Sequence, residues 1–206
     1  MRLRGVARPD AACGALASVR MLTRMNTKQR VRAAILPLCF LAACNAFGGD
    51  SALNLHGGGR SLSNQTDSIS QQSVGGLEAV IGFGDDGWAL EGQGFYAEKS
   101  DLSGNGFDSK VKTKELAVGA RKTFLHNLPV RPYVGLGANW MDAELSNPGA
   151  TTISDDGLGG YAHIGVEAAL LSFQIGIDLR GGLSGAELAG QSQDYVQSTI
   201  FVGLTW

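Results

Sequence analysis

The stretch STIFVGLTW, residues 198–206, alternates apolar side chains with others that are mostly polar or small. A period of two predicts a β-strand, and one face of this strand carries Ile200, Val202, Leu204 and Trp206. A final residue frays unless its neighbours hold it, so a large aromatic side chain here favours a strand that is paired along both edges. The stretch therefore predicts a closed β-barrel.

Charge is distributed unevenly along the chain. Residues 1–43 hold eight of the 17 Lys and Arg residues but only Asp10 of the 19 acidic residues. Residues 44–206 carry the remaining nine basic and 18 acidic side chains, a net charge of −9. The basic segment is therefore distinct from the rest of the chain, and the acidic remainder argues against nucleic acid as a partner.

The basic segment predicts an export signal, or leader, over residues 1–43. Its positive residues precede an apolar stretch at 33–43 that is too short to span a bilayer comfortably. Residues 1–24 are long for the start of such a signal. We therefore expect translation to begin at Met21 or Met25.

The end of the leader resembles the lipobox of bacterial lipoproteins in its residues LAAC, 41–44. The resemblance implies that Cys44 is acylated and becomes the first residue of the exported protein. The alternative is an ordinary signal peptide that is cleaved after Ala46. The other two cysteines lie in the leader, so no internal disulfide is possible after export. Residues 44–50 are a short linker in this scheme, and 51–206 form the barrel.

Period-two alternation recurs from residue 51 onward, where no amphipathic helical pattern of useful length occurs. Eight segments are long enough to cross a bilayer as tilted strands, namely 51–62, 74–84, 88–99, 110–124, 131–145, 158–169, 172–183 and 195–206. Long polar connections at 63–73, 100–109, 146–157 and 184–194 alternate with short ones at 85–87, 125–130 and 170–171. This alternation is typical of outer-membrane barrels, which have long outer loops and short periplasmic turns.

Each predicted strand has one apolar and one polar face. In residues 173–180, for example, Ile175 and Ile177 share one face, and Asp178 and Arg180 share the other. A soluble eight-stranded barrel of the lipocalin type alternates too, with its apolar side chains inside. Here the polar face combines glycine with both signs of charge, which suits a crowded polar interior. The apolar face is aliphatic with aromatic residues near strand ends, which suits lipid.

The polar faces predict a paired charge network inside the barrel. Eight strands enclose an interior that side chains can fill, and an unpaired charge in a narrow interior is costly. The network residues expected from the sequence are Arg60, Glu78, Glu91, Glu115, Arg121, Glu167, Asp178 and Arg180. Further inward positions are Asn54, His56, Gln93, Tyr133 and His163.

The segments KELAVGARKTF (114–124), RPYVGLGANW (131–140) and FVGLTW (201–206) resemble small outer-membrane barrels of the OmpA/OmpX type. The resemblance implies an all-β, eight-stranded antiparallel up-and-down transmembrane barrel in the bacterial outer membrane, in contact with its lipids. It also implies that the barrel-assembly machinery reads Ile200, Val202, Leu204 and Trp206 as a signal. The lipobox departs from the pattern, because most such barrels have a plain signal peptide.

The sequence contains no nucleophile motif, no metal-ligand cluster and no phosphate loop, so we expect no catalytic residues, no metal and no cofactor. The expected role is structural or surface-interactive, in a monomer with a filled interior. An extracellular ligand would bind the polar loops, because recognition concentrates in exposed loops on a rigid scaffold. A small porin or channel and a lipid-modifying outer-membrane enzyme are the alternatives.

Overall fold

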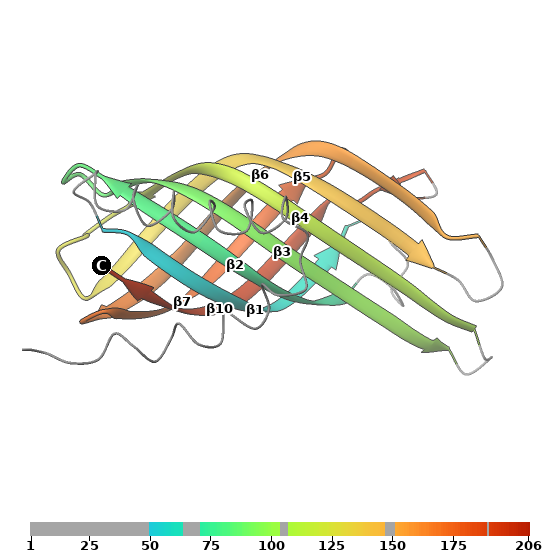
Figure 1. Ribbon diagram of the computed structural model, residues 1–206, viewed down its shortest axis with the longest axis horizontal. Helices are drawn as coiled ribbons and strands as arrows, with labels where there is room; N and C mark the ends of the chain where they lie inside the picture. The colour runs from blue at the N-terminus through green and yellow to red at the C-terminus, as the bar shows by residue number, and fades with distance from the viewer. Residues whose placement is uncertain (1–49, 64–70, 104–106, 147–150, 189) are drawn as a thin grey trace, which may run out of the picture. The chain divides into compact units, whose positions relative to one another are not determined.

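The computed structural model describes residues 50–63, 71–103, 107–146, 151–188 and 190–206, and within them eight long strands close into a barrel (Figure 1). The barrel strands are β1 (Ala52–Leu62), β2 (Gln71–Phe83), β3 (Trp88–Ser103), β4 (Phe107–Thr123), β5 (Val130–Ser146), β6 (Ile153–Leu170), β7 (Phe173–Leu183) and β10 (Tyr195–Thr205). Neighbours in the chain pair antiparallel, and β10 pairs with both β7 and β1. The predicted eight-stranded antiparallel barrel is confirmed.

The barrel lies within the compact unit Ala46–Trp206. The predicted leader, Cys44 and most of the linker fall outside the described residues. No helix in the described ranges is both long enough and apolar enough to span a membrane.

Closure joins the two ends of the barrel sequence. Ser51 and Trp206 exchange backbone hydrogen bonds, 3.2 Å from the Ser51 N–H and 3.0 Å from the Trp206 N–H. Beyond them β1 and β10 pair without interruption from Ala52 opposite Thr205 to Leu62 opposite Tyr195. The last strand is therefore held along both edges, as its sequence predicted.

Several strands extend further than their alternation predicted. The expected loop 100–109 contains the end of β3 and the start of β4, and much of the expected loop 146–157 belongs to β6. Next to these extensions, three lysines of β4 pair with acids of β3 and β5: Lys110 with Glu98, Lys112 with Glu144, and Lys114 with Asp142. Opposite charges across strands stabilise the pairing of β4 with β3 and β5 at this end.

The expected loop 184–194 also contains structure. It forms a small hairpin of β8 (Glu187–Leu188) and β9 (Gln191–Ser192). Ala186 and Leu188 of this segment are buried against Val111 and Ala143, on the inner faces of β4 and β5. The hairpin therefore covers part of the end of the barrel at which the long connections lie.

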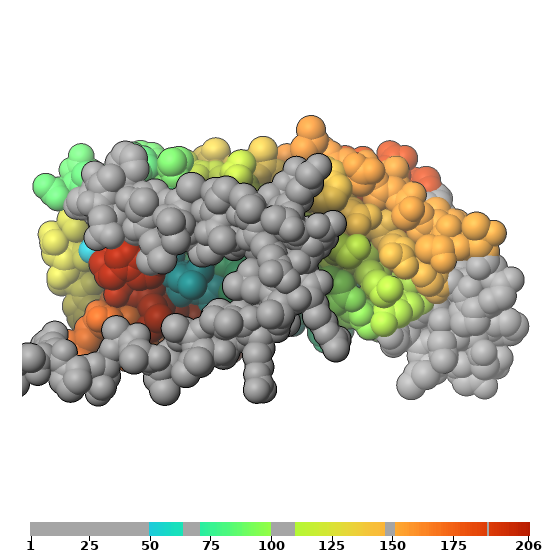
Figure 2. All heavy atoms as spheres, viewed as in Figure 1, coloured from blue at the N-terminus to red at the C-terminus, as the bar shows by residue number. Residues whose placement is uncertain are grey.

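An apolar band surrounds the barrel. On β4 the band lies between Lys114 and Lys122, which are eight residue steps apart. For a strand tilted by roughly 40°, this separation gives the band a height of about 20 Å along the barrel axis. Exposed aromatic residues border the band, with Tyr96 and Trp140 toward the long connections and Phe83, Trp88, Phe124, Phe173 and Trp206 toward the short ones. In the space-filling view, β4 and β6 (yellow-green and orange) continue toward the right-hand end (Figure 2).

Inward glycines make room for inward aromatic rings. A Cβ on Gly176 of β7 would lie 2.4 Å from the ring of Phe201, which projects from the neighbouring strand β10. A Cβ on Gly165 of β6 would meet the Tyr133 ring at 2.3 Å in the same way. The large inward rings therefore fit because the residue beside each of them on the adjacent strand is a glycine, which has no side chain.

Candidate functional site in the barrel interior

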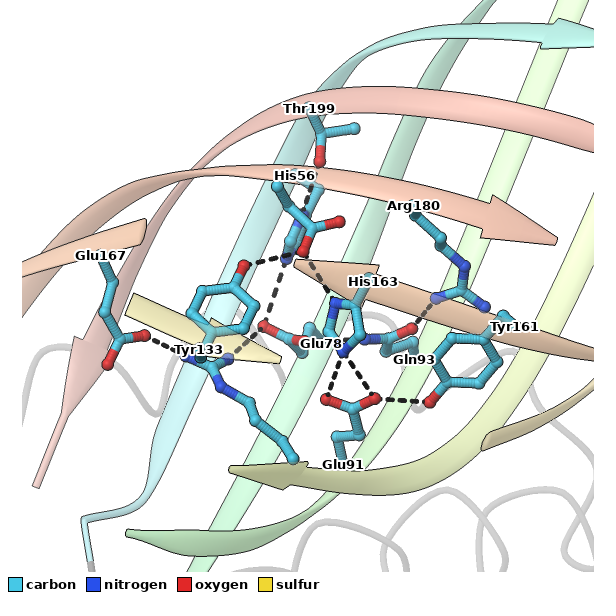
Figure 3. Close-up of polar contacts among 12 residues, drawn as sticks. His56, Glu78, Glu91, Gln93, Tyr133, Tyr161, His163, Glu167, Arg180 and Thr199 are labelled. Carbon is cyan, nitrogen blue, oxygen red and sulfur yellow. Dashed lines mark hydrogen bonds and ion pairs between the residues drawn. The ribbon is translucent and has the colours of Figure 1, made fainter. Parts of the chain in front are cut away.

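All eight residues expected in the charge network are buried, as are the five further inward positions. They form three clusters along the barrel. The outer cluster (Arg60, Glu115, Arg180, Tyr195, Gln197) lies nearest the long connections, and the central cluster (Glu91, Tyr133, Tyr161, His163, Asp178) lies below it. The inner cluster (Glu78, Arg121, Arg131, Glu167) lies nearest the short turns. Figure 3 shows the central cluster and its neighbours.

Glu115 organises the outer cluster. One carboxylate oxygen accepts hydrogen bonds from Arg180 Nη2 and the Tyr195 hydroxyl, both at 2.6 Å, and the other accepts from Arg60 Nη2 at 2.5 Å. Each guanidinium also stacks on an aromatic ring, Arg60 at 4.0 Å from the Tyr195 centroid and Arg180 at 3.7 Å from that of Tyr161. Two cations therefore share one carboxylate, and the rings offset part of their desolvation.

His163 bridges two acids in the central cluster. Its Nδ1 lies 2.7 Å from Asp178 and its Nε2 lies 3.0 Å from Glu91 (Figure 3). The hydroxyls of Tyr133 and Tyr161 donate to the same two carboxylates, at 2.8 Å and 2.6 Å. Ionised carboxylates only accept hydrogen bonds, so with both acids ionised the two ring nitrogens both donate, which is the arrangement of an imidazolium cation.

Arg121 connects two acids in the inner cluster. It donates from Nη2 to Glu167, and its Nη1 lies 3.5 Å from Glu78. Its guanidinium stacks 3.6 Å from the centroid of the Tyr133 ring. Arg131 completes the group through a 2.9 Å contact with Glu167. A cavity of about 550 Å³ opens between these residues and the periplasmic turns.

Amide side chains join the clusters to one another. Gln93 donates to Glu78 at 2.8 Å and accepts a hydrogen bond from Arg180, which links the inner and outer clusters. Asn54 donates to Glu78 at 2.7 Å, and His56 lies between Glu78 and Thr199. The central cluster joins them through the stacks of Arg121 on Tyr133 and Arg180 on Tyr161, so the three clusters form one connected set along the interior.

Charges within the network balance. The four buried arginines and five buried carboxylates of the described part of the chain are taken as ionised, and His163 as the imidazolium that its two acidic neighbours favour. Their sum is zero. Burying one member of such a set without its partners would cost several kcal/mol, roughly 3–5 for a broken buried pair.

Several network members were not expected from the sequence as part of it. Tyr161, Tyr195 and Gln197 lie on inward faces. Tyr161 is two residues before His163, and Tyr195 and Gln197 precede Thr199 and Phe201 at steps of two. The period of two could therefore have predicted their direction. Arg131 opens the predicted strand 131–145, two residues before the inward Tyr133, so the same alternation places it inward.

Among the residues that the structure describes, no group of three or more His, Cys, Asp or Glu side chains could hold a metal ion. His56 and His163 are buried in the network, and His126 lines the periplasmic cavity. The site is thus an assembly of ion pairs and hydrogen bonds.

A closed antiparallel barrel with a polar interior and an apolar outer band is a transmembrane β-barrel. Residues 33–206 match the family model of the outer membrane protein beta-barrel domain, and the chain belongs to that family. The protein is located in the bacterial outer membrane, and the resemblance to small OmpA/OmpX-type barrels is confirmed.

Solved structures show the same fold. Ail of Yersinia pestis, in complex with the heparin analogue sucrose octasulfate, is 16% identical with a TM-score of 0.57, over 77% of this chain and 99% of Ail. Neisserial surface protein A is 15% identical with a TM-score of 0.52, over 77% of this chain and 97% of that one. The N-terminal barrel domain of OprF from Pseudomonas aeruginosa is 16% identical with a TM-score of 0.50, over 75% and 97%. No curated protein sequence is significantly similar to the chain.

Proposed function

We propose that the protein is a monomeric, non-conducting outer-membrane barrel with a structural and surface-interactive role, and that it is not an enzyme. The observation that carries the proposal is the connected, charge-balanced network of the interior. Its three clusters place large side chains from opposite strands in contact, such as Arg180 of β7 with Glu115 of β4 at 2.6 Å. The lipobox at 41–44 supports acylation of Cys44 as part of the same proposal.

Planar-bilayer conductance tests the filled interior. The purified protein is expected to produce no open-channel steps at either polarity, because ions would have to displace paired side chains at three levels. A variant with residues 185–193 replaced by a Gly-Ser linker provides the control. It is expected to remain closed too, since the clusters lie below the hairpin. Discrete steps in the wild-type protein would favour the channel alternative.

The surface role is supported by a sheet that rises above the rest of the barrel. β2 pairs with β3 only as far as Glu98, and β7 pairs with β6 only from Gly160 onward. Beyond these two points, toward the long connections, β3, β4, β5 and β6 continue as a four-stranded sheet, which extends toward the right in Figure 1. We call this the protruding sheet. On the β6 side, Gly185 lies against the backbone of Leu158. On the β3 side, no strand pairing is found beyond Glu98 within the described residues, and such an edge can pair with a partner.

The protruding sheet and the nearby hairpin are acidic. Their described side chains include Lys99, Lys110, Lys112 and Lys114, against Glu98, Asp142, Glu144, Asp155, Asp156, Glu187 and Asp194. The complex of Ail with a heparin analogue is a precedent for ligand binding on this fold. The acidic excess here favours a neutral or basic partner over a sulfated one.

Shortening the protruding sheet tests the surface role. In a variant that joins Lys99 to Lys110 by a short turn, adhesion of expressing cells to host-cell or matrix surfaces is expected to fall to the level of cells without the protein. Heat-modifiable migration on gels is expected to persist, because the variant keeps the membrane-spanning part of every strand. Undiminished adhesion with a folded barrel would count against the proposed surface role.

A further inference from the structure

Two periplasmic turns place leucine where the backbone favours glycine. Leu125 and Leu171 have φ angles of 53° and 57°, in the left-handed region that costs side-chain-bearing residues energy. The β2–β3 turn meets the same requirement with glycine, at Gly84 (φ 69°) and Gly87 (φ 73°). The same barrel therefore uses both solutions, and leucine needs a compensating interaction.

Neither leucine obtains that interaction from the protein. Leu171 is 92% exposed and Leu125 is 60% exposed. The strand ends beside them are exposed and apolar as well: Phe124, Leu128, Val130, Leu170 and Phe173. We call these seven residues the apolar rim. Large apolar side chains in water gain nothing that could offset the backbone strain.

The apolar rim is one continuous surface. The β4–β5 and β6–β7 turns lie side by side, because the Ala169 N–H donates to the Pro129 carbonyl at 2.9 Å. The rim also continues the lipid-facing band, since Val130, Leu170 and Phe173 occupy the same outer faces as Val134, Val166 and Ile175 of their strands.

The opposite side of the periplasmic end is polar. The β2–β3 turn contains Asp85 and Asp86, and Asp50 pairs with Arg131 nearby at 2.8 Å. Asp50 and Asp85 line the cavity of about 550 Å³ that leads to the inner cluster, and the β4–β5 turn contributes its polar residues His126 and Asn127 to the same lining. The two sides of this end therefore suit different surroundings.

We propose that the apolar rim is immersed in the periplasmic leaflet of the outer membrane, with lipid acyl chains and headgroups as its binding partner. The lipid contact then extends past the strand ends at the β4–β5 and β6–β7 turns. The β2–β3 turn stays in water and keeps the cavity open to the periplasm. The barrel consequently sits tilted, and the two leucine turns anchor it.

Methyl signals of the leucines report their surroundings directly. In phosphatidylcholine nanodiscs, the Leu125, Leu128 and Leu171 methyl resonances are expected to broaden with a nitroxide-labelled lipid and to resist a soluble gadolinium chelate. Methyl signals of Leu188, which is buried in the outer hairpin, are expected to respond to neither probe. Broadening of the rim methyls by the gadolinium chelate alone would overturn the proposal.

A substitution gives a second, energetic test. Asparagine tolerates the left-handed conformation, so Leu171→Asn should preserve or raise stability if the turn lies in water. Immersion in lipid predicts the opposite, a lower urea midpoint in vesicles, because a polar amide replaces an apolar side chain in the leaflet. Gly84→Asn is the matched control, since a Cβ there meets nothing within 4 Å and its turn is expected in water. Equal midpoints for the wild-type protein and both variants would overturn the proposal.

Discussion

Replacing Arg180 with methionine is expected to lower the urea midpoint strongly, by an amount equivalent to about 3 kcal/mol of unfolding free energy. Arg180 is fully buried and donates to Glu115, Gln93 and the Tyr195 hydroxyl. Methionine keeps an unbranched stem of similar shape, so the main loss is that of the guanidinium group with its charge and hydrogen bonds. Glu115 would keep only Arg60 as its cationic partner, and two further polar groups would lose a donor.

Lys114→Met is the control for this experiment. Lys114 pairs with Asp142 at 3.2 Å on the outside of the barrel, where the lysine side chain is 57% exposed. Exposed pairs contribute little, so the midpoint should change by no more than about 0.5 kcal/mol equivalent. If both variants unfold with the wild-type protein, Arg180 does not have the structural role assigned to it.

Replacing Trp206 with alanine is expected to reduce delivery to the outer membrane far more than stability. The hydrogen bonds between Trp206 and Ser51 involve only the backbone and survive the change. Our proposal that the assembly machinery reads the final strand predicts a loss of inserted protein of at least about tenfold, equivalent to about 1.4 kcal/mol of recognition. The measurements are the amount in the outer-membrane fraction and the urea midpoint after refolding in detergent.

Trp88→Ala separates recognition from the general effect of losing a tryptophan. Trp88 borders the same side of the apolar band and is 45% exposed, against 50% for Trp206. It lies in β3, outside the proposed signal. The two variants should refold with similar midpoints, while only Trp206→Ala loses insertion in cells. Equal insertion of both would show that Trp206 is not read as a signal.

The fold was predictable because membrane strands follow a simple rule. Each strand faces lipid on one side and the interior on the other, so alternation separated Arg180 from Leu179, and the composition of the two faces identified Arg180 as inward and Leu179 as outward. The rule stops applying above the membrane, where both faces meet water. That is why the sequence missed the outermost residues of the protruding sheet and the hairpin that buries Leu188.

The sequence could predict which residues point into the barrel, but it could not predict which of them pair with one another. Alternation places Glu115 and Arg60 inside, but β1 and β4 are not adjacent in the barrel, so pairing depends on the closed cross-section. The role of Tyr195 also follows only from the structure, since its hydroxyl meets Glu115 across the interior at 2.6 Å. The leucines of the apolar rim carry no sequence signal, because turn conformation at a leucine cannot be inferred from its neighbours.

The charge-balanced core also determines which barrel can form. A slip of one residue between β7 and either neighbour would turn Arg180 and Asp178 toward lipid and Leu179 toward the interior. A slip of two residues would keep the faces but separate Arg180 from Glu115 and His163 from Asp178. In the observed shear, each buried arginine and carboxylate lies within ion-pair distance of an oppositely charged group or of His163. The polar interior therefore acts as a check on register, rejecting misaligned closures that an apolar core would tolerate.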